Sequence, residues 1–300
     1  MKRANLLAIG GGKGGTGKTF LAVNLGTALA ERGKEVILVD ADWGGANLHT
    51  MMGIRSPSRG LDDFFGGRKS IGEVILPTSV PHLYIICGTV RGLPTGNLRY
   101  PEKQRLIRHL HSLRAEYIIL DLGGGVSPHV TDLFLISDRR LLLVTPEPTS
   151  LENAYRFIRG SFFRLLQGLI KTPDIRRKIE GMIEGGDNRF KTPSELIRHI
   201  EELSPDLRGR LSETITSFSP MLVINQVKEK GERDIGISIR NVCRRYFGFE
   251  LQYLGYVAYD PKIPYSILRG RPFLWEYPHT EAAHCLRNIS YKLMGEGGQS

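Results

Sequence analysis

A run of glycines that ends in a lysine and a threonine stands near the start of the chain, from Gly12 to Thr19. It fits the pattern G-x-x-x-x-G-K-[ST], in which glycines let backbone N–H groups turn inward around a polyphosphate. The helix after such a loop adds unpaired N–H groups and the positive end of its dipole. We therefore predict that Lys18 reaches the β- and γ-phosphates of a nucleotide and that the Thr19 hydroxyl binds Mg²⁺.

Two carboxylates follow the next apolar segment. The sequence EVILVD at 35–40 predicts a buried strand, and Asp42 comes directly after it. Ligands in open α/β sheets lie at the carboxyl ends of strands, so both carboxylates should face the nucleotide. We expect Asp42 to orient and activate the attacking water close to Mg²⁺. We expect Asp40 to contact the groups that bind the metal rather than the metal itself.

A third carboxylate ends another apolar segment. The sequence EYIILD at 116–121 predicts a strand that closes on Asp121, which would hold Mg²⁺ through water. Three glycines at 123–125 would let the chain approach the γ-phosphate with its backbone.

The elements that position these residues alternate along the chain. Apolar runs at 6–9, 35–40, 83–87, 116–121, 140–145, 221–226 and 251–257 predict strands. Helices are predicted at 20–31, from Pro101 to about 113, at 151–170, at 235–247 and through 282–293. This order predicts an α/β fold, a mostly parallel twisted sheet flanked by helices on both faces.

We expect a single domain over 1–294 and a flexible tail at 295–300. The polar stretch 171–220, with helical segments at 175–184 and 194–203, is predicted to be a helical insertion.

Composition bounds the class of protein. The chain has 300 residues, 41% hydrophobic and 24% charged, and no apolar run approaches the roughly 18 residues of a membrane span. The three cysteines are scattered without a CxxC pair, which argues against a disulfide framework or a metal knuckle. A net charge of +10 is consistent with an anionic partner, such as nucleic acid or anionic lipid, or with a generally basic surface.

A second lysine, Lys13, lies inside the loop and gives KGGTGKT. This resembles the deviant Walker A motif of the MinD/ParA family of dimerising P-loop ATPases (SIMIBI class). The stretch DADWGGAN at 40–47 resembles that family's first switch, and PEPTSL at 146–151 resembles another of its segments. The flagellar-number regulators (FlhG/FleN-like) look like the nearest branch, although neither their N-terminal activator motif nor a membrane-targeting helix is evident.

The resemblance implies further roles. The signature lysine of the family crosses a dimer interface to phosphates held by the partner, so Lys13 would act in trans. Asn225 matches the family position that reads the adenine edge, and Asp260 lies in a loop like the one beside the base. Phe20 stands where a second threonine is usual, and its backbone N–H would still contact the α-phosphate.

The expected site combines catalytic, nucleotide-binding and metal-binding residues. Catalytic roles fall to Lys13, Lys18 and Asp42. Nucleotide binding falls to Gly12, Gly14, Gly15, Thr16, Gly17, Lys18, Thr19, Phe20, Asn225 and Asp260. Metal binding falls to Thr19, Asp42 and Asp121.

The expected function is that of an ATP- and Mg²⁺-dependent homodimeric ATPase, a nucleotide-switched spatial or assembly regulator with a protein activator or cargo. The alternatives are a ParA-type partition ATPase that binds DNA non-specifically and a metabolic enzyme that phosphorylates a small substrate. We expect a cytoplasmic location, with peripheral association with membrane or nucleoid left open.

Overall fold

One sheet runs through the protein. In the computed structural model, which describes residues 3–88, 98–169, 193–203 and 205–295, eight strands are ordered β3-β4-β2-β5-β1-β6-β7-β8. The strands are β1 Asn5–Gly10, β2 Val36–Ala41, β3 Ile75–Pro77, β4 Leu83–Ile86, β5 Tyr117–Leu122, β6 Arg139–Val144, β7 Met221–Val227 and β8 Gln252–Ala258. All paired neighbours are parallel except β3 and β4.

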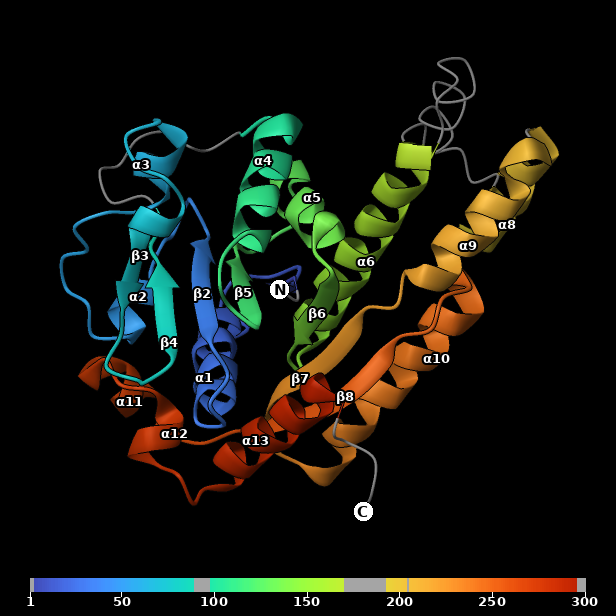
Figure 1. The fold of residues 1–300 in the computed structure, drawn as a ribbon. Coiled ribbons are helices and arrows are strands. Elements are labelled where there is room, and N and C mark those ends of the chain that lie inside the picture. Colours follow the sequence, from blue (N-terminus) through green and yellow to red (C-terminus); the bar gives the residue numbers. More distant parts are fainter. Residues whose placement is uncertain (1–2, 89–97, 170–192, 204, 296–300) are drawn as a thin grey trace.

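Helices cover both faces of the sheet (Figure 1). They are α1 Lys18–Ala30, α2 Leu48–Met51, α3 Leu61–Phe65, α4 Tyr100–His111, α5 Pro128–Ile136, α6 Pro148–Leu169, α8 Pro193–Leu203, α9 Arg208–Ser217, α10 Ile235–Phe247, α11 Ile263–Arg269, α12 Phe273–Glu276 and α13 Glu281–Met294. Short 3₁₀ turns are η1 Gly72–Val74, η2 Pro205–Leu207 and η3 Lys230–Asp234.

The sheet separates two apolar cores. One lies under α4, α5, α6, α9 and α10, and the other lies under α1, α12 and α13. Strands covered on both faces carry near-continuous apolar runs, and β2 is buried at every residue. The predicted fold, a mostly parallel sheet with helices on both faces, is confirmed.

Several elements were not anticipated. They are the edge strand β3 and the helices α2, α5, α9, α11 and α12. The start of α5 did carry a signal, because Pro128 occupies its first turn and the Ser127 hydroxyl accepts a hydrogen bond from the Val130 N–H at 3.4 Å.

The segment 171–220 is described in part. The helix predicted at 194–203 is found as α8, while the one predicted at 175–184 lies outside the described residues. Most of the tail, 296–300, also lies outside them, so the insertion, the tail and the single domain stay predictions. In the described part of the chain, every helix is too short or too polar to cross a bilayer.

Candidate functional site

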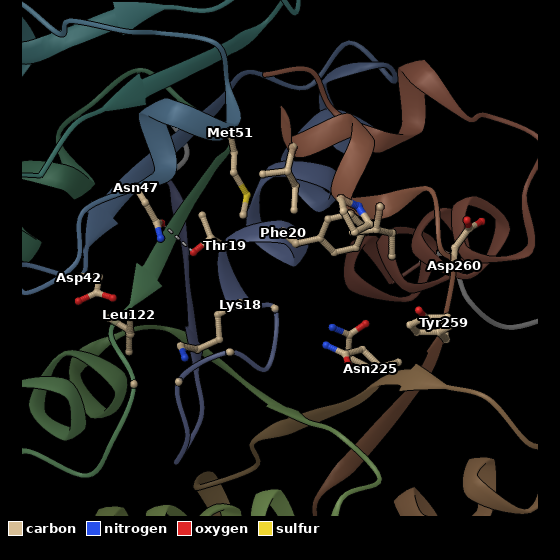
Figure 2. A pocket seen from close by; sticks show the side chains of 18 residues that line it. Lys18, Thr19, Phe20, Asp42, Asn47, Met51, Leu122, Asn225, Tyr259 and Asp260 are labelled. Atoms are coloured by element: carbon tan, nitrogen blue, oxygen red, sulfur yellow. Dashed lines mark hydrogen bonds between the residues drawn. The ribbon is translucent and has the colours of Figure 1, made fainter. Parts of the chain in front are cut away.

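A cavity of about 400 Å³ opens at the carboxyl edge of the central strands. One end is formed by the glycine loop after β1 and by the segments that follow β2 and β5; the other is formed by β7 and the α11 region (Figure 2). Its lining residues are Gly14, Gly15, Gly17, Lys18, Thr19, Phe20, Asp42, Asn47, Met51, Leu122, Gly124, Asn225, Gln226, Tyr259, Asp260, Ile263, Pro264 and Ile267.

The glycine loop has the shape of an anion cradle. Gly15 and Gly17 adopt φ values of 78° and 92°, in the left-handed region that favours glycine. A Cβ atom at Gly17 would lie 2.4 Å from Nδ2 of Asn225, so the loop also needs glycine there for space. At Gly14 and Gly15 a Cβ would meet nothing within 4 Å, which leaves open volume beside their backbone.

Lys18 lies over this loop. Its Nζ donates a hydrogen bond to the carbonyl of Lys13 at 3.2 Å. Burial lowers the pKa of Lys18, and the charges of Asp121 and Asp42 partly oppose that shift. The ammonium therefore sits in a partly desolvated position, where an added phosphate would find a strong electrostatic partner.

Asp40 and Asp121 are neighbours in the sheet, paired in register between β2 and β5. Asp40 is fully buried and accepts hydrogen bonds from the N–H groups of Asp42 at 3.2 Å and Leu48 at 3.1 Å. Burial raises its pKa to about 6, and those two backbone donors limit the rise. Asp40 thus fixes both ends of the segment that carries Asp42 and Asn47.

Asp121 is a buried carboxylate without a hydrogen-bond partner in the described part of the chain. It is 1% exposed, and neither of its carboxylate oxygens is hydrogen-bonded to a described residue. Burial raises its pKa to about 7, and the nearby Thr19 hydroxyl and the charge of Lys18 oppose that rise. A buried carboxylate without a partner is costly unless a cation completes the site.

These oxygen donors fit a magnesium ion. The Thr19 hydroxyl bonds to Oδ1 of Asn47 at 3.3 Å, and Asp42 faces the same end of the cavity (Figure 2). A hydroxyl, a half-buried carboxylate and a fully buried carboxylate behind them form the kind of all-oxygen set that Mg²⁺ prefers when it keeps several waters.

The opposite end of the cavity has a different character (Figure 2). The Asn225 Nδ2 donates to the carbonyl of Thr16 at 2.8 Å, while its Oδ1 is buried and has no partner among the described residues. Gln226 lies at an irregularity in the β7–β8 pairing with φ 61°, a left-handed conformation unusual for glutamine. Tyr259 and Asp260 follow β8 and complete this wall.

Lys13 points to its own chain. Its Nζ makes an ion pair with Oε2 of Glu147 and a hydrogen bond to Oγ1 of Thr149, both at 3.0 Å. The side chain is 39% exposed. Lys13 belongs to the glycine loop, but its side chain is held beside the cavity, against Glu147 and Thr149 at the start of α6.

The segment after β5 closely approaches both the glycine loop and Asp42, which follows β2. A Cβ at Gly124 would lie 2.9 Å from the Gly14 nitrogen, and one at Gly123 would lie 2.8 Å from Oδ1 of Asp42. Only glycine allows such an approach without displacement.

A similar joint lies beside the cavity, between the ends of α2 and α11. Gly53 and Gly270 both have positive φ, and a Cβ on Gly53 would lie 2.8 Å from the Gly270 oxygen.

The structure brings most of the predicted site residues together. Those that line the cavity are Gly14, Gly15, Gly17, Lys18, Thr19, Phe20, Asp42, Asn225 and Asp260. Asp121 lies behind the lining, Thr16 is buried in the loop, and Lys13 is turned aside. Gly12 does not line the cavity, because it packs against α6, where a Cβ would lie 1.9 Å from the Asn153 oxygen.

Other lining residues were not singled out from the sequence. Met51, Gln226, Ile263, Pro264 and Ile267 come from α2, β7 and α11. Their apolar or uncharged side chains give no chemical signal, and only the fold shows that α11 returns to the nucleotide loop.

Comparisons with known proteins agree with this geometry. A family model described as the CobQ/CobB/MinD/ParA nucleotide binding domain matches residues 7–273. The antiactivator FleN of Pseudomonas aeruginosa is 24% identical over 295 residues, which is 98% of this chain and 87% of that protein. The septum site-determining protein MinD of Thermotoga maritima is 30% identical over 256 residues, which is 81% of this chain and 88% of that protein.

A solved structure supports the fold. The structure of the septum site-determining protein MinD of Pyrococcus horikoshii, complexed with Mg-ADP, matches with a TM-score of 0.67 at 19% identity, covering 98% of each chain. The resemblance inferred from the glycine loop and the segments at 40–47 and 146–151 is confirmed. The chain belongs to the family of CobQ/CobB/MinD/ParA nucleotide-binding domains.

Proposed function

We propose that this protein is an ATPase that dimerises when it binds ATP and that hydrolyses ATP to ADP and phosphate. One observation carries the proposal: a single cavity joins an amide cradle with Lys18 and Asp42 at one end, backed by Asp121, to Asn225 at the other. The first end suits a triphosphate and the second offers a buried amide oxygen that could accept a hydrogen bond from an adenine amino group.

The residues would divide the work of phosphoryl transfer. Lys18 neutralises charge on the β- and γ-phosphates, and the loop amides hold the phosphates in place. Asp42 orients the attacking water, because it faces the cavity beside Gly123. Bound Mg²⁺, held by Thr19 and Asp42 and through water by Asp121, would supply further neutralisation of the phosphate oxygens.

Lys13 would serve a second subunit. In the single chain its ammonium is paired with Glu147, outside the cavity. A rotation of this exposed side chain away from Glu147 would let it reach phosphates held by a partner placed face to face. The dimer would then be the ATP state, and hydrolysis would release it.

Substitution of Lys13 tests this arrangement. Lys13→Ala should abolish ATP-dependent dimerisation in analytical ultracentrifugation, while binding of a fluorescent ATP analogue stays unchanged. Lys34→Ala is the matched control, because Lys34 also forms a 3.0 Å ion pair, with Glu116, and has a similar exposure of 35%. A full Lys13→Ala dimer in the presence of ATP would rule out the role in trans.

The names of the relatives support a proposal for the biological role. An antiactivator and septum site-determining proteins are among them, so we propose that the ATP dimer binds a protein and controls where or when a cell structure is assembled.

The Asp42→Ala variant should bind ATP without turning it over and should stay dimeric. If that variant hydrolyses ATP at the wild-type rate, Asp42 does not orient the water.

A second candidate function rests on charge. Five exposed arginines lie on α6 and α10, which pack together through Tyr155 and Phe247 with ring centroids 5.9 Å apart. They are Arg156, Arg159, Arg240, Arg244 and Arg245. Such a surface, on a chain of net charge +10, could bind DNA backbone as partition ATPases do.

Filter retention distinguishes the two. Retention of random duplex DNA that requires ATP, falls steeply with salt and is lost on reversing Arg240, Arg244 and Arg245 to Glu would favour the partition function. Retention that is absent in both nucleotide states would exclude it.

A further inference from the structure

Trp43 is the residue that follows Asp42, and its indole is stacked. The ring centroids of Trp43 and His129 are 3.7 Å apart with an interplanar angle of 33°. Phe65 meets the indole edge to face, at 5.7 Å and 81°. Trp43 therefore packs between α3 and the first turn of α5, and its own Nε1 is buried without a hydrogen-bond partner among the described residues.

The stack joins the two segments that meet at the cavity. Trp43 belongs to the segment after β2, and His129 lies in α5, four residues past Gly125. The same two segments touch at a second point, where Gly123 lies against Oδ1 of Asp42. With one contact at Asp42 and one at the next residue, the backbone carrying this carboxylate has little freedom to rotate.

Both rings of the stack are uncharged at physiological pH. Burial lowers the pKa of His129 to about 4, and the charge of the nearby Lys103 lowers it further. The imidazole is therefore neutral at physiological pH, and two neutral rings can stack without the cost of burying a cation. Neither ring reaches the cavity lining, so their influence on a nucleotide would be indirect.

We propose that Trp43 and His129 are positioning residues, whose stack holds the Asp42 carboxylate at the phosphate end of the cavity. The inference rests on the proposed ATPase function, since Asp42 needs a fixed place only if it orients water. A misplacement of about 1 Å in such a group can cost on the order of 100-fold in rate. Loss of the stack should therefore reduce turnover and leave nucleotide binding intact.

Kinetics of ring variants test the proposal. Trp43→Ala should lower kcat by about 10- to 100-fold with the Kd for Mg-ATP unchanged, and Trp43→Phe should recover most of the loss. The control is Trp275→Phe, since this second tryptophan lies on α12 and is 40% exposed.

A wild-type kcat for Trp43→Ala would overturn the positioning role. Equal losses for Trp43→Ala and Trp43→Phe would also overturn it, because a phenyl ring can stack where a methyl group cannot.

Fluorescence provides a readout that does not depend on turnover. Trp275→Phe leaves Trp43 as the single tryptophan of the chain. In that background, His129→Ala should expose the indole and raise acrylamide quenching, whereas His129→Phe should not. Equal quenching in the two variants would overturn the stack. A wild-type protein without ATP turnover would instead refute the ATPase function, and the quenching result would still judge the stack.

Discussion

Two lysines of one loop have opposite surroundings. Lys18 is partly desolvated and lies over the cradle, with Asp42 and Asp121 close enough to favour its charge. Lys13 is exposed and paired with Glu147. The sequence pattern predicts a role for each, but only the structure shows that the Lys13 side chain must leave an intramolecular ion pair before it could act on another subunit.

His129 should make folding stability depend on pH. Its pKa is about 4 in the folded state against an ordinary value of 6.5, so the unfolded chain binds the proton more tightly. The stabilisation is present above pH 6.5 and is lost as the pH falls toward 4. Between pH 7.5 and pH 5 the loss should be about 2 kcal/mol.

His129→Phe keeps an aromatic ring and removes the titration. Urea unfolding at pH 7.5 and pH 5 should show a smaller loss of stability for this variant than for the wild type. Equal losses in the two proteins would contradict a buried neutral imidazole.

At the scale of elements, α5 connects the site to its surroundings. Its Asp132 is 3% exposed and forms an ion pair with Lys103 of α4 at 2.8 Å. The same carboxylate accepts from Nε of Arg164 on α6 at 2.6 Å. The buried Asp132 carboxylate thus joins α4, α5 and α6. Helix α5 begins at Pro128, shortly after the glycines at 123–125.

Removing this carboxylate should be costly. Asp132→Ala leaves the buried Lys103 ammonium without its partner, which should lower the free energy of unfolding by roughly 3–5 kcal/mol. Chemical denaturation measures the change. Glu152→Ala breaks an exposed ion pair with Arg156 on α6 and should cost far less, because solvent screens such pairs. Similar costs for the two variants would show that the Asp132 network does not stabilise the packing of the three helices.

Prediction from the sequence succeeded where local chemistry is strong. The strands that precede the glycine loop, Asp42 and Asp121 were placed within one or two residues, because their apolar runs end in chemically informative groups. The helix α11 and the His129 ring were missed, since a seven-residue helix in a loop has little periodicity and a lone histidine has many roles. Their importance arises from contacts between distant segments.

At the scale of the whole molecule, the candidate site lies at the middle of the sheet. Strand β1 lies between β5 and β6, and β2 lies on the far side of β5, so the glycine loop and the three carboxylates converge at one edge (Figure 1). A ligand at this place contacts segments from nearly the whole chain, from Gly14 to Ile267. Binding should therefore stabilise the protein as a unit.

Thermal unfolding should reveal this linkage. At 100 times its Kd, Mg-ATP should stabilise the wild type by about 2.7 kcal/mol and raise its melting temperature. Lys18→Ala should lose most of the increase. An unchanged melting temperature for the wild type at saturating Mg-ATP would mean that the folded state does not bind the nucleotide.

The close approach of Gly53 to Gly270 joins the ends of α2 and α11. Because the two backbones meet with no side chain between them, a displacement of one helix relative to the other would have to disrupt this contact. Both helices line the cavity, through Met51 of α2 and Ile267 of α11, so this contact lies where two parts of the cavity wall meet. A side chain added at either glycine would act as a wedge between them.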